Sequence, residues 1–198
     1  MATRRGPRFK ECRRLGVNVC GHPKAMERAG APAFKKTKKT SDYGLHLIEK
    51  QKVKAYYGIL ERQLRRYFEI AAKSKEMTGV ALLVELECRL DNLVYRLGFA
   101  NSIRMARQMV SHCHIEVDGV KINIPSYAVK AGDVVEIREK SKSSQRYKDI
   151  LEVTGGRLVP AWLEADQESL SGTVKELPLR EQIDVPVNET LIVELYSK

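Results

Sequence analysis

Apolar residues at helical spacing predict a helical body in the first half of the chain. Between Leu45 and Ala71 they recur every three or four positions along one side of an α-helix, and Gly58 is placed to bend or interrupt it. After Thr78, a suitable capping residue, a second apolar run predicts another short helix. The apolar positions of the two runs are Leu45, Ile48, Val53, Tyr56, Ile59, Leu60, Leu64, Tyr67, Phe68 and Ala71, then Leu82, Leu83, Leu86 and Leu90.

The stretch RLDNLVYRLGFANSIRMARQMVSHCH, residues 89–114, predicts two shorter amphipathic helices. Gly98 suits the C-terminus of the first, and Asn101 or Ser102 can cap the second. The apolar sides are Leu90, Leu93, Val94 and Leu97 in the first helix, then Ile103, Ala106, Met109 and Val110 in the second. The opposite sides are polar and mostly basic: Arg89, Asn92 and Arg96, then Arg104, Arg107, Gln108 and Ser111.

These polar sides contain an unusual excess of positive charge. Surface helices usually pair opposite charges three or four residues apart, and no acid is available for such pairing from Asn92 to His114. We therefore expect both basic sides to face outward. At this point two interpretations remain, a solvated surface that happens to be basic and a surface for an anionic partner.

The apolar period changes from helical to two after residue 114. Ile115 and Val117 lead into Asp118–Gly119, and this dipeptide between alternating apolar residues is typical of a tight hairpin. A second turn at Lys130–Asp133 precedes a strand at Val134–Ile137. Helices followed by a small antiparallel sheet predict a compact α+β module over residues 88–148.

The last fifty residues predict elements that complete the helical body. The segment SKSSQRYKDILEV is expected to form a polar turn and a helix, and Trp162 to anchor the returning chain. Val174 with Leu177 suggests a short edge hairpin. The final segment NETLIVELYSK begins with the capping residue Asn188, and its apolar spacing favours a helix over a strand.

The fold class expected from these patterns is α+β. A mostly helical body over 41–87, completed by 149–198, contains the inserted module of two helices packed on a short antiparallel sheet. Residues 1–40 are rich in glycine and proline, and we expect a basic, irregular and extended segment there.

Positive charge is concentrated at the N-terminus of the chain. The net charge is +10, and residues 1–40 alone hold 12 Lys and Arg against two Glu. Such a segment favours a polyanion, because each neutralised phosphate releases counterions. A membrane surface fits less well, since the stretch MATRRGPRFKECRRLG, residues 1–16, offers only Phe9 and Leu15 as large apolar anchors. The basic clusters are Arg4, Arg5, Arg8, Lys10, Arg13 and Arg14, then Lys35, Lys36, Lys38 and Lys39.

Composition narrows the class of protein further. At 43% hydrophobic the chain is apolar enough to fold, and it has neither a membrane-length apolar run nor the apolar core of a secretory signal. We therefore expect a cytoplasmic protein with reduced thiols, of which Cys88 and Cys113 are expected to be core or near-surface residues. No phosphate-binding glycine loop or nucleophile–base pattern is present, so an enzyme is not expected.

Several particular stretches together resemble bacterial small-subunit ribosomal protein four. They are SDYG near residue 41, EKQK and YG.LERQ..RY after it, RLDNLVYRLGF, ARQMVSH, I.VDG..INIPSY.VK.GDVV.I, WLE.D and LIVELYSK. The similarity extends from about Arg5 to the last residue. The resemblance implies a structural protein of the small subunit that binds small-subunit ribosomal RNA at a multi-helix junction and acts early in subunit assembly.

The resemblance also implies partners and site residues. It implies contact with ribosomal protein five, which bears on decoding accuracy, and a place beside ribosomal protein three on the path by which messenger RNA enters. The lysines 35–39 match the basic segment of that path, and Lys130 is a lesser RNA-binding candidate near the hairpin. The residues that fall on the RNA-facing helix pair are Arg89, Asn92, Arg96, Arg104, Arg107, Gln108, Ser111 and His112.

One departure from the family concerns zinc. Some members bind zinc through four N-terminal cysteines, whereas this region offers only Cys12, Cys20 and His22. A closed tetrahedral site needs a fourth ligand. We therefore expect no metal and no other cofactor, with these three residues as weak candidates.

Two other functions compete with the ribosomal one. An enzyme that carries the same module as an accessory would need a catalytic domain, and neither flank of the module matches one. A stand-alone RNA-binding factor, of the stress or quality-control kind that acts on stalled large subunits, would be a shorter chain dominated by the module. The acidic C-terminal region suits either solvent or a basic neighbouring protein, and its acids include Glu164, Asp166, Glu168, Glu176, Glu181 and Asp184.

Overall fold

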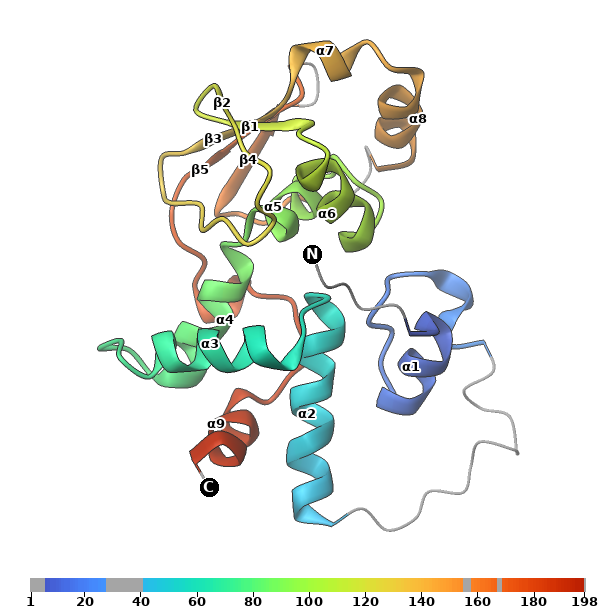
Figure 1. Cartoon of the computed structure of the whole chain (residues 1–198). Helices are drawn as coiled ribbons and strands as arrows, with labels where there is room; N and C mark the ends of the chain where they lie inside the picture. Colours follow the sequence, from blue (N-terminus) through green and yellow to red (C-terminus); the bar gives the residue numbers. More distant parts are fainter. Residues whose placement is uncertain (1–5, 28–40, 155–157, 167–168, 198) are drawn as a thin grey trace. The chain divides into compact units, whose positions relative to one another are not determined.

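The computed structural model describes residues 6–27, 41–154, 158–166 and 169–197, which form helices and one antiparallel sheet. This confirms the α+β class. The chain divides into two compact units, residues 1–82 with 185–198 and residues 83–184. Helix α4 (Thr78–Glu87) crosses the boundary between them. Figure 1 shows the elements of both units.

The first unit is helical, as the apolar spacing predicted. Gly58, with a φ of 60°, separates two helices because a left-handed residue cannot continue an α-helix. Ser41 caps the first of these, since its Oγ accepts the Gly44 N–H at 3.3 Å. The elements besides α4 are α1 (Arg8–Leu15), the 3₁₀ turn η1 (Pro23–Ala25), α2 (Asp42–Tyr56), α3 (Glu61–Ala71) and α9 (Glu189–Ser197).

Helix α9 packs along α2 and closes the first unit. The Asn188 N–H donates to Glu49 at 3.0 Å, and the Asn188 side chain accepts the Thr190 N–H at 3.1 Å. His46, buried on α2, lies 3.2 Å from Glu194 on α9. The prediction of a C-terminal helix that begins at the capping residue Asn188 is therefore confirmed.

Glu61, at the start of α3, joins three helices of this unit. Its carboxylate accepts hydrogen bonds from Lys50 (2.9 Å) and Lys54 (2.8 Å) on α2 and from the Tyr196 hydroxyl (2.8 Å) on α9. Partial burial raises the pKa of Glu61, but these three donors outweigh it and lower the pKa from 4.5 to about 2. The ionised carboxylate therefore stabilises the fold.

The depressed pKa of Glu61 predicts a pH-dependent contribution to stability. The stabilisation by Glu61 is complete above pH 4.5, where this carboxyl is ionised in the unfolded chain as well. It is lost as the pH falls towards about 2, the pKa of Glu61 in the folded protein. We expect Glu61→Gln to be less stable than the natural chain near neutral pH, with the difference shrinking towards that lower limit. Urea unfolding across this range measures it, with Glu69→Gln as the exposed control. A difference that does not change with pH would contradict the prediction.

The second unit combines helices with the five-stranded sheet. The helices besides α4 are α5 (Leu90–Arg96), α6 (Ile103–Ser111), α7 (Glu139–Lys142), α8 (Gln145–Thr154) and the 3₁₀ turn η3 (Arg180–Gln182). The strands are β1 (Ile115–Val117), β2 (Val120–Lys121), β3 (Val134–Ile137), β4 (Leu163–Asp166) and β5 (Ser171–Val174). Their order in the sheet is β2-β1-β3-β5-β4, and every neighbouring pair is antiparallel.

The predicted turns of this unit are confirmed. Asp118 and Gly119 both have positive φ, 50° and 73°, as a primed hairpin turn between β1 and β2 requires. Gly132 has a φ of 95° in the turn before β3. Ser102 rather than Asn101 caps α6, because its Oγ accepts the Met105 N–H at 3.4 Å.

The sheet continues beyond residue 148, where the sequence analysis ended the module. Strand β5 pairs with β3, with Gly172 opposite Val135, and β4 forms the edge. The predicted hairpin of Val174 with Leu177 is wrong in its pairing, since Val174 lies opposite Leu163 and Leu177 is 51% exposed outside the strands. The periodicity of this short, polar strand was too weak to reveal its partner.

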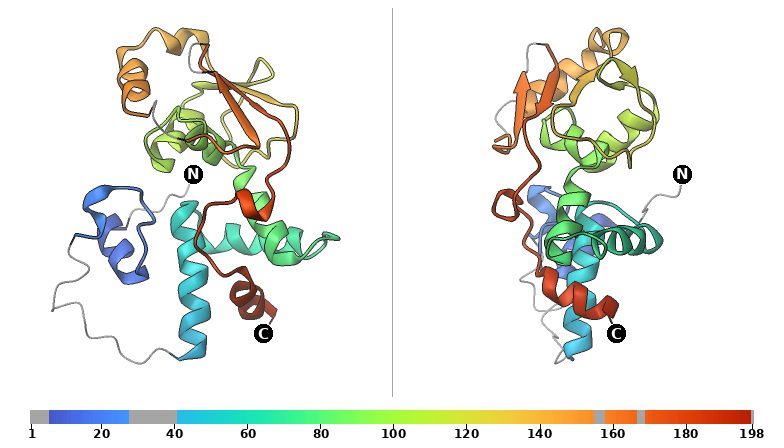
Figure 2. Two further views of the ribbon diagram at one scale, coloured as in Figure 1. Left: turned by 180° about the vertical axis from the view of Figure 1, so that it is seen from behind. Right: turned by 90° about the vertical axis from the view of Figure 1, so that its left-hand side faces the viewer.

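The core of the second unit lies between the sheet and the helices α5, α6 and α8. Leu93 and Leu97 of α5 and Met109 of α6 belong to one buried cluster with Val135 and Trp162. Figure 2 shows α5 and α6 against one face of the curved sheet. Trp162 is only 1% exposed, which confirms its predicted role as an anchor.

Gly172 is a position where the sheet and α5 approach closely. A Cβ built there would collide with the Leu97 side chain and lie 3.1 Å from the Glu164 carbonyl oxygen. We expect Gly172→Ala to lower the free energy of unfolding by about 1–3 kcal/mol through overpacking. Thr173→Ala, on the opposite face of β5, is the matched control. Equal stabilities of the two variants in urea unfolding would show that Leu97 moves aside without cost.

Candidate nucleic-acid interface

The polar side of α5 and Arg107 of α6 are largely buried, which corrects the outward face expected for them. Arg89 and Asn92 are each 2% exposed, and the side chains of Arg96 and Arg107 are 20% and 12% exposed. All four contact an acidic side chain within the same unit. The prediction of an exposed basic face is therefore wrong for these four residues.

Asp91 is the centre of the first buried cluster. Its carboxylate accepts from Arg89 Nε at 3.0 Å and Nη2 at 2.9 Å, which makes a two-pronged contact. Arg107 of α6 reaches the same carboxylate through Nε at 2.9 Å and Nη2 at 2.6 Å. One acid thus joins the start of α5 to the middle of α6, with two guanidinium groups around it.

Glu87, at the end of α4, is the centre of the second buried cluster. Asn92 donates to Glu87 Oε2 at 2.6 Å and to its carbonyl oxygen at 3.1 Å. Arg96 donates to the same carboxylate through Nη2 at 2.7 Å and Nε at 3.2 Å. Since the Glu87 side chain is only 1% exposed, this cluster is a buried link between the end of α4 and α5.

A segment after the hairpin supports the start of α5. The Leu90 N–H donates to the Tyr127 carbonyl oxygen at 2.9 Å, and the Asp91 N–H donates to that of Pro125 at 3.1 Å. Tyr127 is half-buried against the core. Together with the two acidic clusters, these contacts make α5 and α6 a rigid pair.

The exposed members of the predicted RNA-facing helix pair lie along α6. Arg104, Gln108, Ser111 and His112 are exposed, and their spacing places them on one side of the helix. These four residues are exposed, whereas Arg107 is mostly buried. The pattern of charges along the sequence did not reveal this difference. Lys130, in the turn before β3, is also exposed.

Neighbouring His114 has a structural role. Its Nδ1 lies 2.9 Å from the Ser141 hydroxyl, and its ring meets Tyr147 edge-on, with 5.8 Å between the ring centroids. His114 therefore serves packing, whereas His112 is exposed.

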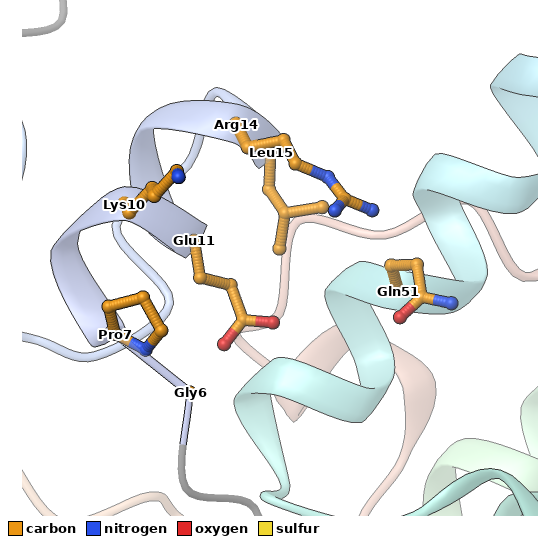
Figure 3. Close-up of a pocket in the computed structure, with 7 residues that line it drawn as sticks. All are labelled: Gly6, Pro7, Lys10, Glu11, Arg14, Leu15 and Gln51. Atoms are coloured by element: carbon orange, nitrogen blue, oxygen red, sulfur yellow. The ribbon is translucent and has the colours of Figure 1, made fainter.

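The N-terminal basic residues lie partly within the described chain. Arg8, Lys10 and Arg14 are exposed on α1, and Arg13 is half-buried. Lys10 and Arg14 line a pocket of about 360 Å³, which Gln51 of α2 also borders. Figure 3 shows this pocket with its cationic side chains and the carboxylate of Glu11.

Six predicted RNA-binding residues lie outside the described residues. They are Arg4, Arg5, Lys35, Lys36, Lys38 and Lys39.

A basic side of α3 was missed by the sequence analysis. Arg62, Arg65 and Arg66 are exposed there, and one acid, Glu69, lies 3.5 Å from Arg65. The signal was present in the sequence, because these arginines face away from the apolar stripe that predicted the helix. That stripe was used only to locate the core.

The weak zinc candidates are only partly brought together. Cys12 and Cys20 have their sulfur atoms 3.5 Å apart, whereas His22 Nδ1 accepts the Lys24 N–H at 3.2 Å and its ring packs on Phe9. Within the described residues, no group of three or more His, Cys, Asp or Glu is arranged to hold a metal ion.

Among the described residues, no helix has both the length and the apolar character that crossing a membrane requires.

Comparison with known proteins finds two family profiles and full-length relatives. Residues 3–87 match the ribosomal protein S4/S9 N-terminal domain, and residues 88–135 match the S4 domain. Proteins named small ribosomal subunit protein uS4 are similar over the full length of both chains. The identity is 56% for Lachnospira eligens, 57% for Lachnoclostridium phytofermentans and 48% for Finegoldia magna.

Proposed function

The chain belongs to the family of small ribosomal subunit protein uS4, and on this premise we propose how its surfaces serve that role. It is a structural, non-enzymatic protein of the small subunit that binds ribosomal RNA. The resemblance seen in the sequence is therefore confirmed at the level of the family.

We propose that residues 88–148 are the RNA-binding module and that α6 presents its central contact surface. The observation that carries this is the exposed row Arg104, Gln108, Ser111 and His112, held on a helix that Asp91 fixes from behind. Folded RNA is recognised mostly by shape, phosphate and 2′-hydroxyl contacts, which suit a rigid helix with cationic and hydrogen-bonding side chains.

In this proposal Arg89, Asn92, Arg96 and Arg107 act mainly by positioning. Their guanidinium and amide groups are already hydrogen-bonded to Asp91 or Glu87, so a phosphate contact through these same N–H groups would first have to break a buried pair. They keep the α6 row in place for RNA.

We propose that basic residues of the first unit also contact RNA. Arg8, Lys10 and Arg14 on α1 and the exposed arginines of α3 offer cations whose neutralisation by phosphate releases counterions. Lys35, Lys36, Lys38 and Lys39 are proposed to lie near the path of messenger RNA, on the strength of the family resemblance and their charge.

We also propose a cytoplasmic location and the finer roles of the family for this chain. These roles are early action in assembly of the small subunit, contact with ribosomal protein five and an effect on decoding accuracy, and a position beside ribosomal protein three. The exposed acids Glu164, Asp166, Glu176, Glu181 and Asp184 would suit a basic protein neighbour.

A stand-alone RNA-binding factor is the alternative function. The match to uS4 proteins over the full length of both chains favours the ribosomal role, because a factor of that kind needs only the module. Sedimentation separates the two: added to a cell extract, the tagged chain should enter newly assembled small subunits. Recovery on large subunits alone would support the alternative.

Titration of the full-length protein against small-subunit ribosomal RNA tests the RNA-binding function. An unrelated RNA of similar length is the control, and both titrations are repeated over a range of salt. We expect preference for the ribosomal RNA and a steep loss of affinity with salt. Equal affinity for both RNAs would limit the protein to non-specific binding by its basic residues.

A further inference from the structure

Cys12 and Cys20 form a close pair of thiols near the N-terminus. Their sulfur atoms are 3.5 Å apart, and both cysteines are reduced. An S–S bond is about 2.05 Å long, so the sulfur atoms would have to approach by only roughly 1.5 Å. Side-chain rotation within a short loop can supply a movement of this size.

The backbone already holds the two cysteines on facing sides of a turn. Gly16, with a φ of 70°, ends α1, and its N–H donates to the Cys12 carbonyl oxygen. The Val17 N–H donates to the same oxygen at 3.2 Å, so the chain doubles back directly after the helix. The loop between the two cysteines therefore needs no refolding to close.

The two thiols differ in access to solvent. Cys12 is fully buried on the inner side of α1, whereas Cys20 is partly exposed and its thiol contacts the Asn18 side-chain oxygen at 3.6 Å. Burial raises the pKa of the Cys12 thiol. An oxidant from solution would therefore reach Cys20 first, and Cys12 would be the nearby thiol that reacts with the product.

We propose that Cys12 and Cys20 form a reversible intramolecular disulfide when the protein meets a hydroperoxide. The Cys20 thiolate attacks the peroxide, an S–O bond forms, and the O–O bond breaks with loss of water after protonation. The Cys12 sulfur then attacks the sulfenic acid, the S–S bond forms, and a second water leaves. Two thiols are thereby oxidised, and one hydrogen peroxide is reduced to two waters.

The remaining cysteines are placed differently. Cys88 is buried, and its burial, together with the carboxylates of Glu85 and Glu87, raises its pKa to about 12. Its thiol stays protonated and unreactive. Cys113 follows α6 and is partly exposed. Within the described residues no second thiol is shown in contact with it, so Cys113 is a control for the effect of exposure alone.

The disulfide would tie α1 to the segment before η1. This cross-link closes a short loop beside Arg8, Lys10 and Arg14, the exposed cations of α1, and restricts the chain that carries them. Disulfides in cytoplasmic proteins are usually transient and responsive to redox conditions. Oxidation would thus act on the basic N-terminal region and leave the second unit unchanged.

Mass spectrometry of the purified full-length protein treated with hydrogen peroxide tests the proposal. We expect loss of two of the four thiols and of two hydrogen atoms from the chain mass, both reversed by a dithiol reductant. Trypsin cuts after Arg13 and Arg14, between the two cysteines, so the oxidised protein should give residues 11–13 and 15–24 as one linked species.

Two variants complete the test. Cys20→Ser should abolish the linked species and the paired loss of thiols, whereas Cys113→Ser should lose two of its three thiols as the natural chain does. Cys20 is only partly buried, so its substitution avoids the core change that Cys12→Ser would bring. The proposal is overturned by paired thiol loss in Cys20→Ser, by links between two chains, or by sulfinic acid at Cys20 without linkage.

Discussion

Asp91→Asn is expected to lower the free energy of unfolding by about 3–5 kcal/mol, which is the usual cost of removing one partner from a buried ion pair. The substitution keeps the size and shape of the side chain, so the change in the free energy of unfolding measures the loss of its negative charge. Arg89 and Arg107 would keep their buried or nearly buried guanidinium groups and lose the carboxylate between them. Urea unfolding of both proteins at one pH measures the difference.

An exposed ion pair of the same unit gives the matched control. Glu164 lies 3.3 Å from Lys175, and their side chains are 65% and 53% exposed. Because solvent screens such a pair, Glu164→Gln should cost less than about 1 kcal/mol. If Asp91→Asn were equally mild, the cluster would not be what holds α5 and α6 together, and the positioning role proposed for Arg107 would fail with it.

Elements specified by local pattern could be predicted from the sequence. The interruption at Gly58, the cap at Asn188 and the primed turn at Asp118–Gly119 each depend on residues within a few positions, and the structure has all three. Periodicity likewise identified the buried sides of α5 and α6, since a helix buries whichever stripe is apolar.

Features that depend on distant residues could not be predicted in the same way. Arg107 and Arg104 are the same residue type on the same helix, but Arg104 is exposed, whereas Arg107 is mostly buried against an acid that lies sixteen positions earlier in the chain. Charge pairing at helical spacing gives no sign of such a partner. The pairing of β5 with β3 was missed for a similar reason, because tertiary contacts rather than local pattern select that neighbour.

The difference between Arg104 and Arg107 also separates the two contributions to RNA binding. Arg104→Ala should leave stability within about 0.5 kcal/mol of the natural chain, as for most exposed substitutions. If Arg104 contacts phosphate, its loss should weaken binding of ribosomal RNA about tenfold and reduce the salt slope by about one. Filter binding over a salt series measures both quantities.

Arg107→Ala is the matched substitution on the buried side of the same helix. It should cost about 2–3 kcal/mol of stability, less than Asp91→Asn because Arg89 still pairs with the carboxylate. When binding is measured under conditions where the variant is fully folded, its salt slope should equal that of the natural chain, since no phosphate contact is removed. The opposite pattern, with the slope reduced only by Arg107→Ala, would mean that RNA opens the Asp91 cluster and binds the arginine that the free protein keeps buried.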